Sequence, residues 1–247
     1  MADPSSVLVR DLHKRFGRIH AVRGVSFSLG RGEVLGFLGP NGAGKTTTMR
    51  MITGFLTPTS GSATAGGFDV SDNPVAVKKQ IGYLPENAPA YASMTVTGFL
   101  RFAASIRGFR GSEMQDRVES TIRKCQLEGV RHQTISTLSK GYRQRTCFAQ
   151  AVLHDPPILI MDEPTDGLDP NQKYVVREMI KQMASEKAII VSTHILEEVD
   201  AVCTRALIIA KGQVVANGTP AELRAHSDTG RLEDVFRKCT LGETHHA

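Results

Sequence analysis

The chain has 247 residues, 40% of them apolar and 22% charged, which is the composition of a globular protein with a sizeable core. It has no apolar run of about 18 residues or more, so the sequence predicts no membrane-spanning helix. The formal net charge of +5 comes from scattered cations, which favours a solvated surface over a nucleic-acid partner. The four widely spaced cysteines lack the spacing of metal ligands, and we expect reduced thiols in a cytosolic protein.

Short apolar runs of strand length recur towards both ends of the chain. In chain order they are VLVRDL (7–12), VSFSL (25–29), VLGFLGP (34–40), ILIMDEP (158–164), AIIVSTH (188–194) and ALIIAKG (206–212). Runs that are apolar throughout indicate strands covered on both faces of a parallel sheet. Helical spacing lies between the later strands, first after Asp169 and Pro170, which suit an N-cap and a first helical position. This alternation predicts an α/β fold.

The middle of the chain differs, because from about Ala88 to Asp155 the patterns are helical with little strand signal. Ser112 and Gln115 have the spacing of a capping box, with an apolar helical stripe after them. We therefore expect one domain over the whole chain, in which a helical subdomain (88–155) is inserted into a core formed by residues 1–87 and 156–247.

The C-terminal part carries three further patterns. KGQVVANGT (211–219) is typical of a hairpin, and short helical patterns follow at 220–226 and 231–239. The closing GETHHA (242–247) is expected to be frayed, and its paired histidines are expected to hold no metal.

A glycine-rich segment, Gly39–Thr46, fits the pattern G-x-x-x-x-G-K-[ST] between a predicted strand and a predicted helix. Its glycines allow backbone N–H groups to point at phosphate oxygens, and the helix that begins near Lys45 adds its positive dipole end. Lys45 is expected to reach the β- and γ-phosphates, and the Thr46 hydroxyl to ligate Mg²⁺. The expected nucleotide contacts are Gly39, Pro40, Asn41, Gly42, Ala43, Gly44, Lys45, Thr46 and Thr47. This segment alone leaves a kinase, a GTPase and a motor open.

Acidic and imidazole side chains follow two of the apolar strands. Asp162 and Glu163 end ILIMDEP, and His194 ends AIIVSTH. Strands of a parallel sheet end at one edge, so these side chains are expected beside the phosphates. Asp162 can then hold Mg²⁺, Glu163 can polarise the attacking water as general base, and His194 can contact the γ-phosphate.

In the order GPNGAGKTT, LSKGYRQR, ILIMDEPTDGLDP and STH, these motifs resemble those of the ATP-binding cassette (ABC) family over nearly the whole chain. The resemblance implies a P-loop NTPase core with an antiparallel β subdomain and an inserted helical subdomain. It also implies that two cassettes face each other head to tail and enclose two ATP molecules.

Within this resemblance, LSKGYRQR (138–145) is similar to the family's signature motif. Ser139 and the N–H of Gly141 would then contact the γ-phosphate of ATP held by the partner subunit. Lys140 and Tyr142 stand where Gly and Gln are commoner. Lys140 either adds positive charge near the triphosphate or points to water, and we expect the second.

Three further roles are implied by the family. Glu86 stands where the family usually has a glutamine that ligates Mg²⁺, with Gln80 as a weaker alternative. Phe16 lies where the family has an aromatic residue that stacks on adenine, although a core phenylalanine is the alternative. Asp169 resembles a residue of the loop that contacts the partner's nucleotide site.

The implied function is that of an ATPase subunit, with ATP and Mg²⁺ as ligands, which pairs with a second copy and drives a separate integral membrane permease. We expect it on the cytoplasmic face of the membrane, without a nucleic-acid partner. LSKGYRQR and TDGLDPNQ resemble bacterial exporters of drugs, lipids or polysaccharides and those linked to gliding motility. The alternative is a soluble cassette ATPase outside transport, such as one that serves iron–sulfur assembly.

Overall fold

The computed structural model of the chain describes residues 6–87, 89–227 and 229–241. GETHHA, for which we expect frayed backbone, lies outside these described residues. Within them, no helix has both the length and the apolar content that a membrane span requires.

The N-terminal part folds into a small antiparallel sheet with strand order β2-β1-β4-β5. Its strands are β1 (Val7–Phe16), β2 (Ile19–Leu29), β4 (Ser60–Ala65) and β5 (Phe68–Asp69). Buried and exposed residues alternate along the second half of β2, because only one face of this sheet packs on the core. The expected antiparallel β subdomain is present, and β1 extends beyond VLVRDL to Phe16.

A larger six-stranded sheet has the strand order β10-β9-β3-β8-β7-β6. Its strands are β3 (Val34–Leu38), β6 (Ile81–Leu84), β7 (Ile158–Asp162), β8 (Ala188–Thr193), β9 (Arg205–Ala210) and β10 (Gln213–Gly218). All pairs are parallel except β9–β10, which is the hairpin that the sequence predicts. Every residue of β3, β7 and β8 is buried, as expected for strands that are apolar on both faces.

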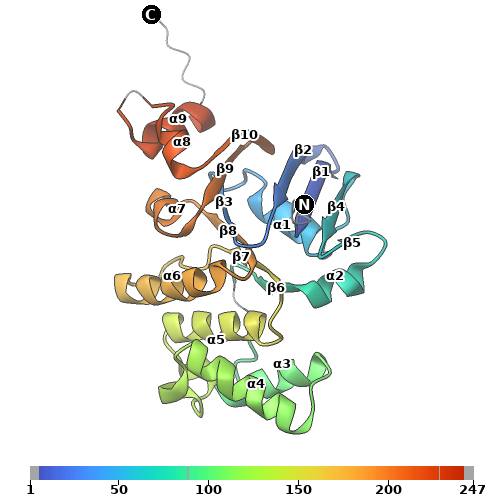
Figure 1. Ribbon diagram of the computed structural model, residues 1–247, viewed down its shortest axis with the longest axis vertical. Helices are drawn as coiled ribbons and strands as arrows, with labels where there is room; N and C mark the ends of the chain where they lie inside the picture. Colours follow the sequence, from blue (N-terminus) through green and yellow to red (C-terminus); the bar gives the residue numbers. More distant parts are fainter. Residues whose placement is uncertain (1–5, 88, 228, 242–247) are drawn as a thin grey trace, which may run out of the picture.

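Helices cover the larger sheet and extend away from it (Figure 1). They are α1 (Lys45–Ile52), α2 (Pro74–Gln80), α3 (Val96–Ile106), α4 (Gly111–Lys124), α5 (Lys140–Val152), α6 (Pro170–Ala184), α7 (Leu196–Val202), α8 (Pro220–Arg224) and α9 (Leu232–Leu241). Between β6 and β7 the described residues form helices and two short 3₁₀ turns, Glu128–Val130 and Ile135–Thr137. Figure 1 shows α3 and α4 at the end of the molecule opposite to α8 and α9.

Two predicted helix caps have different outcomes. Asp169 caps α6, because its side chain accepts a hydrogen bond from the backbone N–H of Gln172. The capping box at Ser112 is wrong, because α4 already begins at Gly111 and has no side-chain cap. Ser112 therefore lies inside the first helical turn, where it cannot serve as the N-cap.

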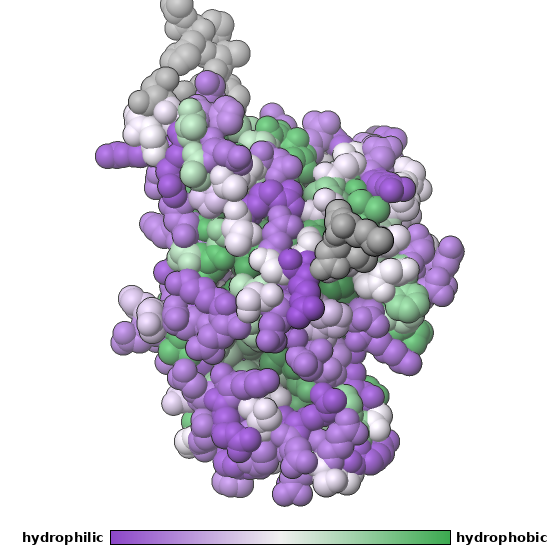
Figure 2. Space-filling view, viewed as in Figure 1, coloured by the Kyte–Doolittle hydropathy of each residue, from purple (hydrophilic) through white to green (hydrophobic). Residues whose placement is uncertain are grey.

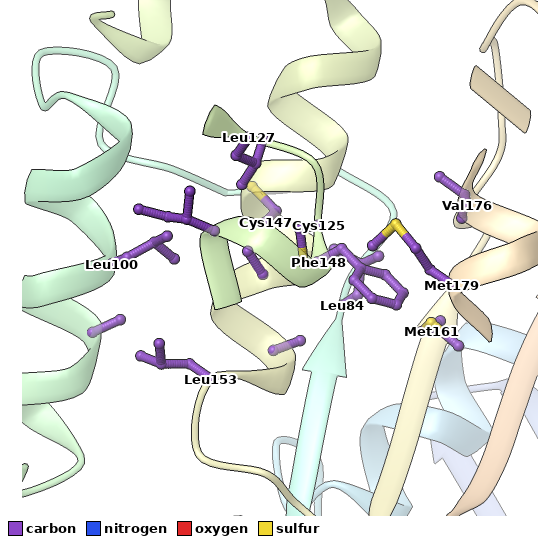
Figure 3. Close-up of a cluster of buried hydrophobic side chains, with 14 of the residues drawn as sticks. Leu84, Leu100, Cys125, Leu127, Cys147, Phe148, Leu153, Met161, Val176 and Met179 are labelled. Atoms are coloured by element: carbon purple, nitrogen blue, oxygen red, sulfur yellow. The ribbon is translucent and has the colours of Figure 1, made fainter. Parts of the chain in front are cut away.

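Helix α5 joins the helices between β6 and β7 to the larger sheet. Figure 3 shows Phe148 of α5 directed towards Met179 of α6, above the strands that carry Leu84 and Met161. These side chains belong to one buried cluster, in which Phe148 is 1% exposed. Dense packing of this kind fixes α5, and with it the residues at its N-terminus, relative to the sheet.

Figure 2 shows a face dominated by hydrophilic residues, on which apolar residues form small separate groups. Isolated apolar side chains are normal on soluble proteins, so only an apolar groove or a larger group suggests a contact with a partner.

We predict that Phe148→Ala lowers the free energy of unfolding by about 3–5 kcal/mol, because a large buried side chain is replaced by a cavity. Denaturant titration of the purified chain measures this change. Phe55→Ala is the matched control, since Phe55 is 67% exposed, and it should cost less than about 1 kcal/mol. Equal losses for the two variants would contradict the placement of Phe148 in the core.

Candidate active site

Three neighbouring parallel strands, β3, β8 and β7, end at one edge of the larger sheet. The glycine-rich segment follows β3, Glu163 follows β7 and His194 follows β8. A pocket of about 440 Å³ opens at this edge. Its walls are formed by Ala21, Pro40, Asn41, Gly42, Ala43, Gly44, Lys45, Thr46, Thr47, Glu86, Glu163, Asp166 and His194. The predicted phosphate-binding segment and two of the predicted catalytic residues therefore share one pocket.

The shape of the glycine-rich segment depends on Gly44, which precedes α1. Its φ is +104°, and an added Cβ would lie 2.7 Å from the carbonyl oxygen of Ala21. Only glycine fits this backbone and this close approach without strain. The turn directs the start of α1 into the pocket, where its free N–H groups and positive dipole end favour an anion.

The Lys45 side chain is nearly enclosed, with 5% of the residue exposed. Its ammonium donates hydrogen bonds to the carbonyl oxygens of Gly39 at 2.6 Å and Pro40 at 3.3 Å. It also lies 3.7 Å from Oε1 of Glu163. Burial lowers the pKa of Lys45, and the negative charge of Glu163 partly opposes this shift. A buried cation held by its own loop is well suited to exchange these carbonyls for phosphate oxygens.

Glu163 contacts both Lys45 and His194 in the pocket. While Oε1 faces Lys45, Oε2 lies 3.0 Å from Nδ1 of His194. Its backbone has a φ of +48°, a conformation that is costly for residues other than glycine. The Glu163 N–H donates to the Ser192 side chain at 3.0 Å, which helps to hold this turn. A carboxylate fixed between a lysine and a histidine can accept a proton from a water molecule in the pocket.

Asp162 is the last residue of β7, next to Glu163; it is 1% exposed and is not one of the residues that form the pocket walls. Its Oδ1 accepts a hydrogen bond from the Ser192 hydroxyl at 2.5 Å. Its Oδ2 is buried and has no hydrogen-bond partner among the described residues. An unpaired buried carboxylate oxygen is costly, so this atom fits a cation or a cation-bound water.

The residues present therefore fit Mg²⁺, although the described residues contain no cluster of three or more His, Cys, Asp or Glu side chains that would bind a metal alone. Thr46 and Glu86, unlike Asp162, line the pocket, and they also offer oxygen atoms. Mg²⁺ is usually held by one or two carboxylates together with phosphates and water, so a complete protein cage is not required.

Other predicted residues lie away from this pocket. Phe16 is 47% exposed at the end of β1, beside the ammonium of Lys14, and does not line the phosphate pocket. Ser139 caps α5 and accepts a hydrogen bond from the N–H of Tyr142, while Gly141 packs against Gln172. Gln80 ends α2 outside the pocket walls, which include Glu86 instead.

Three residues of the site were missed by sequence reasoning. Asp166 lines the pocket, and its position shortly after Glu163 on the same turn could have revealed it. Ser192 precedes His194 on β8 and links Asp162 to the backbone of Glu163. Ala21 carries no sequence signal, because only the fold brings β2 against the glycine-rich segment.

The structure also corrects the expectation for Lys140. Its side chain is 60% exposed but does not simply point to water, because its Nζ lies 3.7 Å from Oδ2 of Asp166. The ammonium therefore faces a carboxylate on the pocket wall as well as solvent.

Comparisons with known proteins agree with this geometry. A family model described as ABC transporter matches residues 22–166. The ABC transporter ATP-binding protein NatA of Bacillus subtilis (strain 168) is 38% identical over 219 residues, which are 88% of this chain and 88% of that protein. The Nod factor export ATP-binding protein I of Ralstonia nicotianae is 34% identical over 92% of this chain and 71% of that protein. Longer curated relatives also match, and the chain spans 39% of their length.

The fold has solved counterparts as well. The structure of an ATP-binding subunit of an ABC transporter superposes with a TM-score of 0.82 and 30% identity, over 97% of each chain. The family match, the sequence relatives and this shared cassette fold point to the same assignment. The chain belongs to the ABC transporter family and is an ATP-binding subunit of the type that hydrolyses ATP.

Proposed function

We propose that this chain is the ATPase subunit of an exporter and drives a separate integral membrane permease. The observation that carries the proposal is the meeting of Lys45, Glu163 and His194 in one pocket of about 440 Å³. The name of the Ralstonia relative assigns that protein to Nod factor export, and this supports the exporter subclass. The motif LSKGYRQR supports the same subclass.

In this proposal the pocket holds the triphosphate of ATP. Lys45 exchanges its contacts with the carbonyls of Gly39 and Pro40 for contacts with the β- and γ-phosphates. Glu163 accepts a proton from the attacking water, and His194 orients the carboxylate and the water. Thr46, Asp162 and Glu86 would hold Mg²⁺, which neutralises phosphate charge when it is bound. Phe16 stacks on the adenine ring at the outer end of β1.

A second copy of the chain completes each site in this proposal. Ser139 and Gly141 lie at the N-terminus of α5, whose positive dipole end favours an anion. They do not line the pocket of their own chain, so we assign them to the γ-phosphate held by the partner copy. Asp169 at the start of α6 belongs to the same contact between copies. Closing and opening of this pair would supply a rigid-body motion.

The permease is proposed to dock in a groove of about 440 Å³ between the loop after β6 and helices α3 and α5. Its apolar lining includes Tyr91, which is 56% exposed, and Ile106, which is 69% exposed. The groove begins at Pro89, shortly after Glu86 in the pocket wall. A short apolar helix of a membrane protein fits such a groove, and pressure on it would reach Glu86 along the connecting loop.

We propose that the chain lies on the cytoplasmic face of the membrane, where ATP is supplied. We also propose that residues 88–155 act as a helical subdomain within the nucleotide-binding core of residues 1–87 and 156–247. The helices α3, α4 and α5 between β6 and β7 support that division.

We predict that Glu163→Gln lowers ATP turnover by about 10²–10⁴-fold, the usual contribution of a general base, while ATP binding persists. Phosphate release and nucleotide binding are measured on the same preparation. Lys45→Ala is the contrasting variant and should lose tight ATP binding, because the pocket then lacks its buried cation. Unchanged turnover in Glu163→Gln would exclude Glu163 as the base.

We predict that Glu86→Gln keeps near-normal Mg²⁺-dependent turnover, because an amide oxygen can still ligate Mg²⁺. Glu86→Ala removes the oxygen and should raise the Mg²⁺ concentration needed for half-maximal activity. Measuring ATP turnover against Mg²⁺ concentration at fixed ATP gives the Mg²⁺ requirement of both variants. Complete loss of activity in Glu86→Gln would show that the carboxylate has another, specific task.

We predict that Ile106→Glu loses the membrane partner in a mild-detergent purification followed by mass spectrometry, because the charge cannot be buried in an apolar interface. Basal ATPase activity without membranes should persist. Ile19→Glu is the matched control, since both isoleucines are 69% exposed and Ile19 lies on the β1–β2 hairpin. If both variants retain a protein with several membrane spans, or both lose it, the groove is not the docking surface.

A further inference from the structure

The proposed triphosphate pocket is rich in negative charge. One lysine, Lys45, faces three carboxylates on its walls, those of Glu86, Glu163 and Asp166. The charge of Glu163 is matched by Lys45, and Glu86 lies in the set proposed for Mg²⁺. Asp166 has neither partner, so its charge would repel the triphosphate unless another cation offsets it.

Lys140 supplies that cation from the signature motif. Its Nζ lies 3.7 Å from Oδ2 of Asp166, and the two side chains are 60% and 49% exposed. The ammonium rests against Gly167, where an added Cβ would lie 2.0 Å from Nζ. Gly167 also has a φ of +61°. Because Gly167 has no side chain, the turn that carries Asp166 leaves room for the ammonium of Lys140.

Two further contacts fix the start of α5 against the segment that follows Glu163. The side-chain amide of Gln144 donates a buried hydrogen bond of 3.1 Å to the carbonyl oxygen of Pro164. Gly141 packs so closely on Gln172 of α6 that an added Cβ would lie 2.5 Å from Oε1 of Gln172. Lys140 thus extends from a backbone whose position relative to Asp166 is set by buried groups.

The local sequence setting of Lys140 is unfavourable without such a partner. It is the first residue of α5, where the positive end of the helix dipole disfavours a cation. The ion pair with Asp166 offsets this cost. A lysine in this position is therefore better explained by its carboxylate partner than by helix propensity.

We infer that Lys140 is a positioning residue for the ATP pocket of its own chain, because it neutralises Asp166 and holds that carboxylate at the pocket wall. This inference rests on the proposed function, in which Ser139 and Gly141 serve the partner's ATP. The signature motif then acts on both nucleotides, on the partner's through Ser139 and Gly141 and on its own through Lys140.

The test measures the dissociation constant for MgATP in the Glu163→Gln background, at protein concentrations too low for two copies to pair. Lys140→Ala should raise this constant about two- to fivefold, as expected for an exposed ion pair. Added salt should shrink the difference. In an Asp166→Asn background, Lys140→Ala should have no further effect, and Lys140→Arg should bind like the parent. Lys181→Ala removes another exposed lysine, which pairs with Glu178, and should change nothing.

The outcomes separate the alternatives. An unchanged dissociation constant in Lys140→Ala overturns the inference. So does a rise in the dissociation constant that is equally large in the parent background and in the Asp166→Asn background, because Lys140 would then act on the nucleotide itself. Turnover is measured in the chain that retains Glu163. If Lys140→Ala lowers turnover at saturating MgATP but leaves the affinity for MgATP unchanged, a positioning role through Asp166 is excluded. Failure of the parent chain to bind MgATP would instead contradict the proposed function.

Discussion

The active site depends on one constraint, which is that β3, β7 and β8 are buried on both faces and run parallel. Such strands must end at a common edge, because their hydrogen-bonded register leaves no other arrangement. Lys45, Glu163 and His194 follow these three ends and meet there, with Lys45 and Glu163 buried and the side chain of His194 45% exposed. Exposing these apolar strands to water would be unfavourable, so the strands stay packed. Their packing keeps the Lys45 ammonium and the Glu163 carboxylate close together, although the two groups would separate in water.

The second feature of the site is the pairing of its acidic side chains with cationic or polar partners. Glu163 is held between Lys45 and His194 in a strained backbone, and Asp162 has one oxygen paired with Ser192 and one buried oxygen without a partner among the described residues. Asp166 is balanced by Lys140, which comes from α5 rather than from the sheet. The oxygen donors of the pocket suit Mg²⁺, and the N-terminus of α1 together with Lys45 suits phosphate groups.

Much of this arrangement could be predicted from the sequence, for reasons that also explain the failures. Continuous apolar runs predict β3, β7 and β8, and parallel topology then brings their ends together. The strand β4, Ser60–Ala65, has small polar residues and was missed, because its pairing with β1 rather than its own pattern makes it a strand. The contacts Glu163–His194 and Lys140–Asp166 depend on side-chain directions that no spacing rule supplies.

A structure of Glu163→Gln with MgATP tests the central claim most directly, because it locates the triphosphate relative to both copies of the chain. The account predicts that the γ-phosphate lies within hydrogen-bonding distance of Lys45 from one copy and of Ser139 from the other. A triphosphate bound away from Lys45, or bound by one copy with Ser139 of every neighbour turned away, would contradict it.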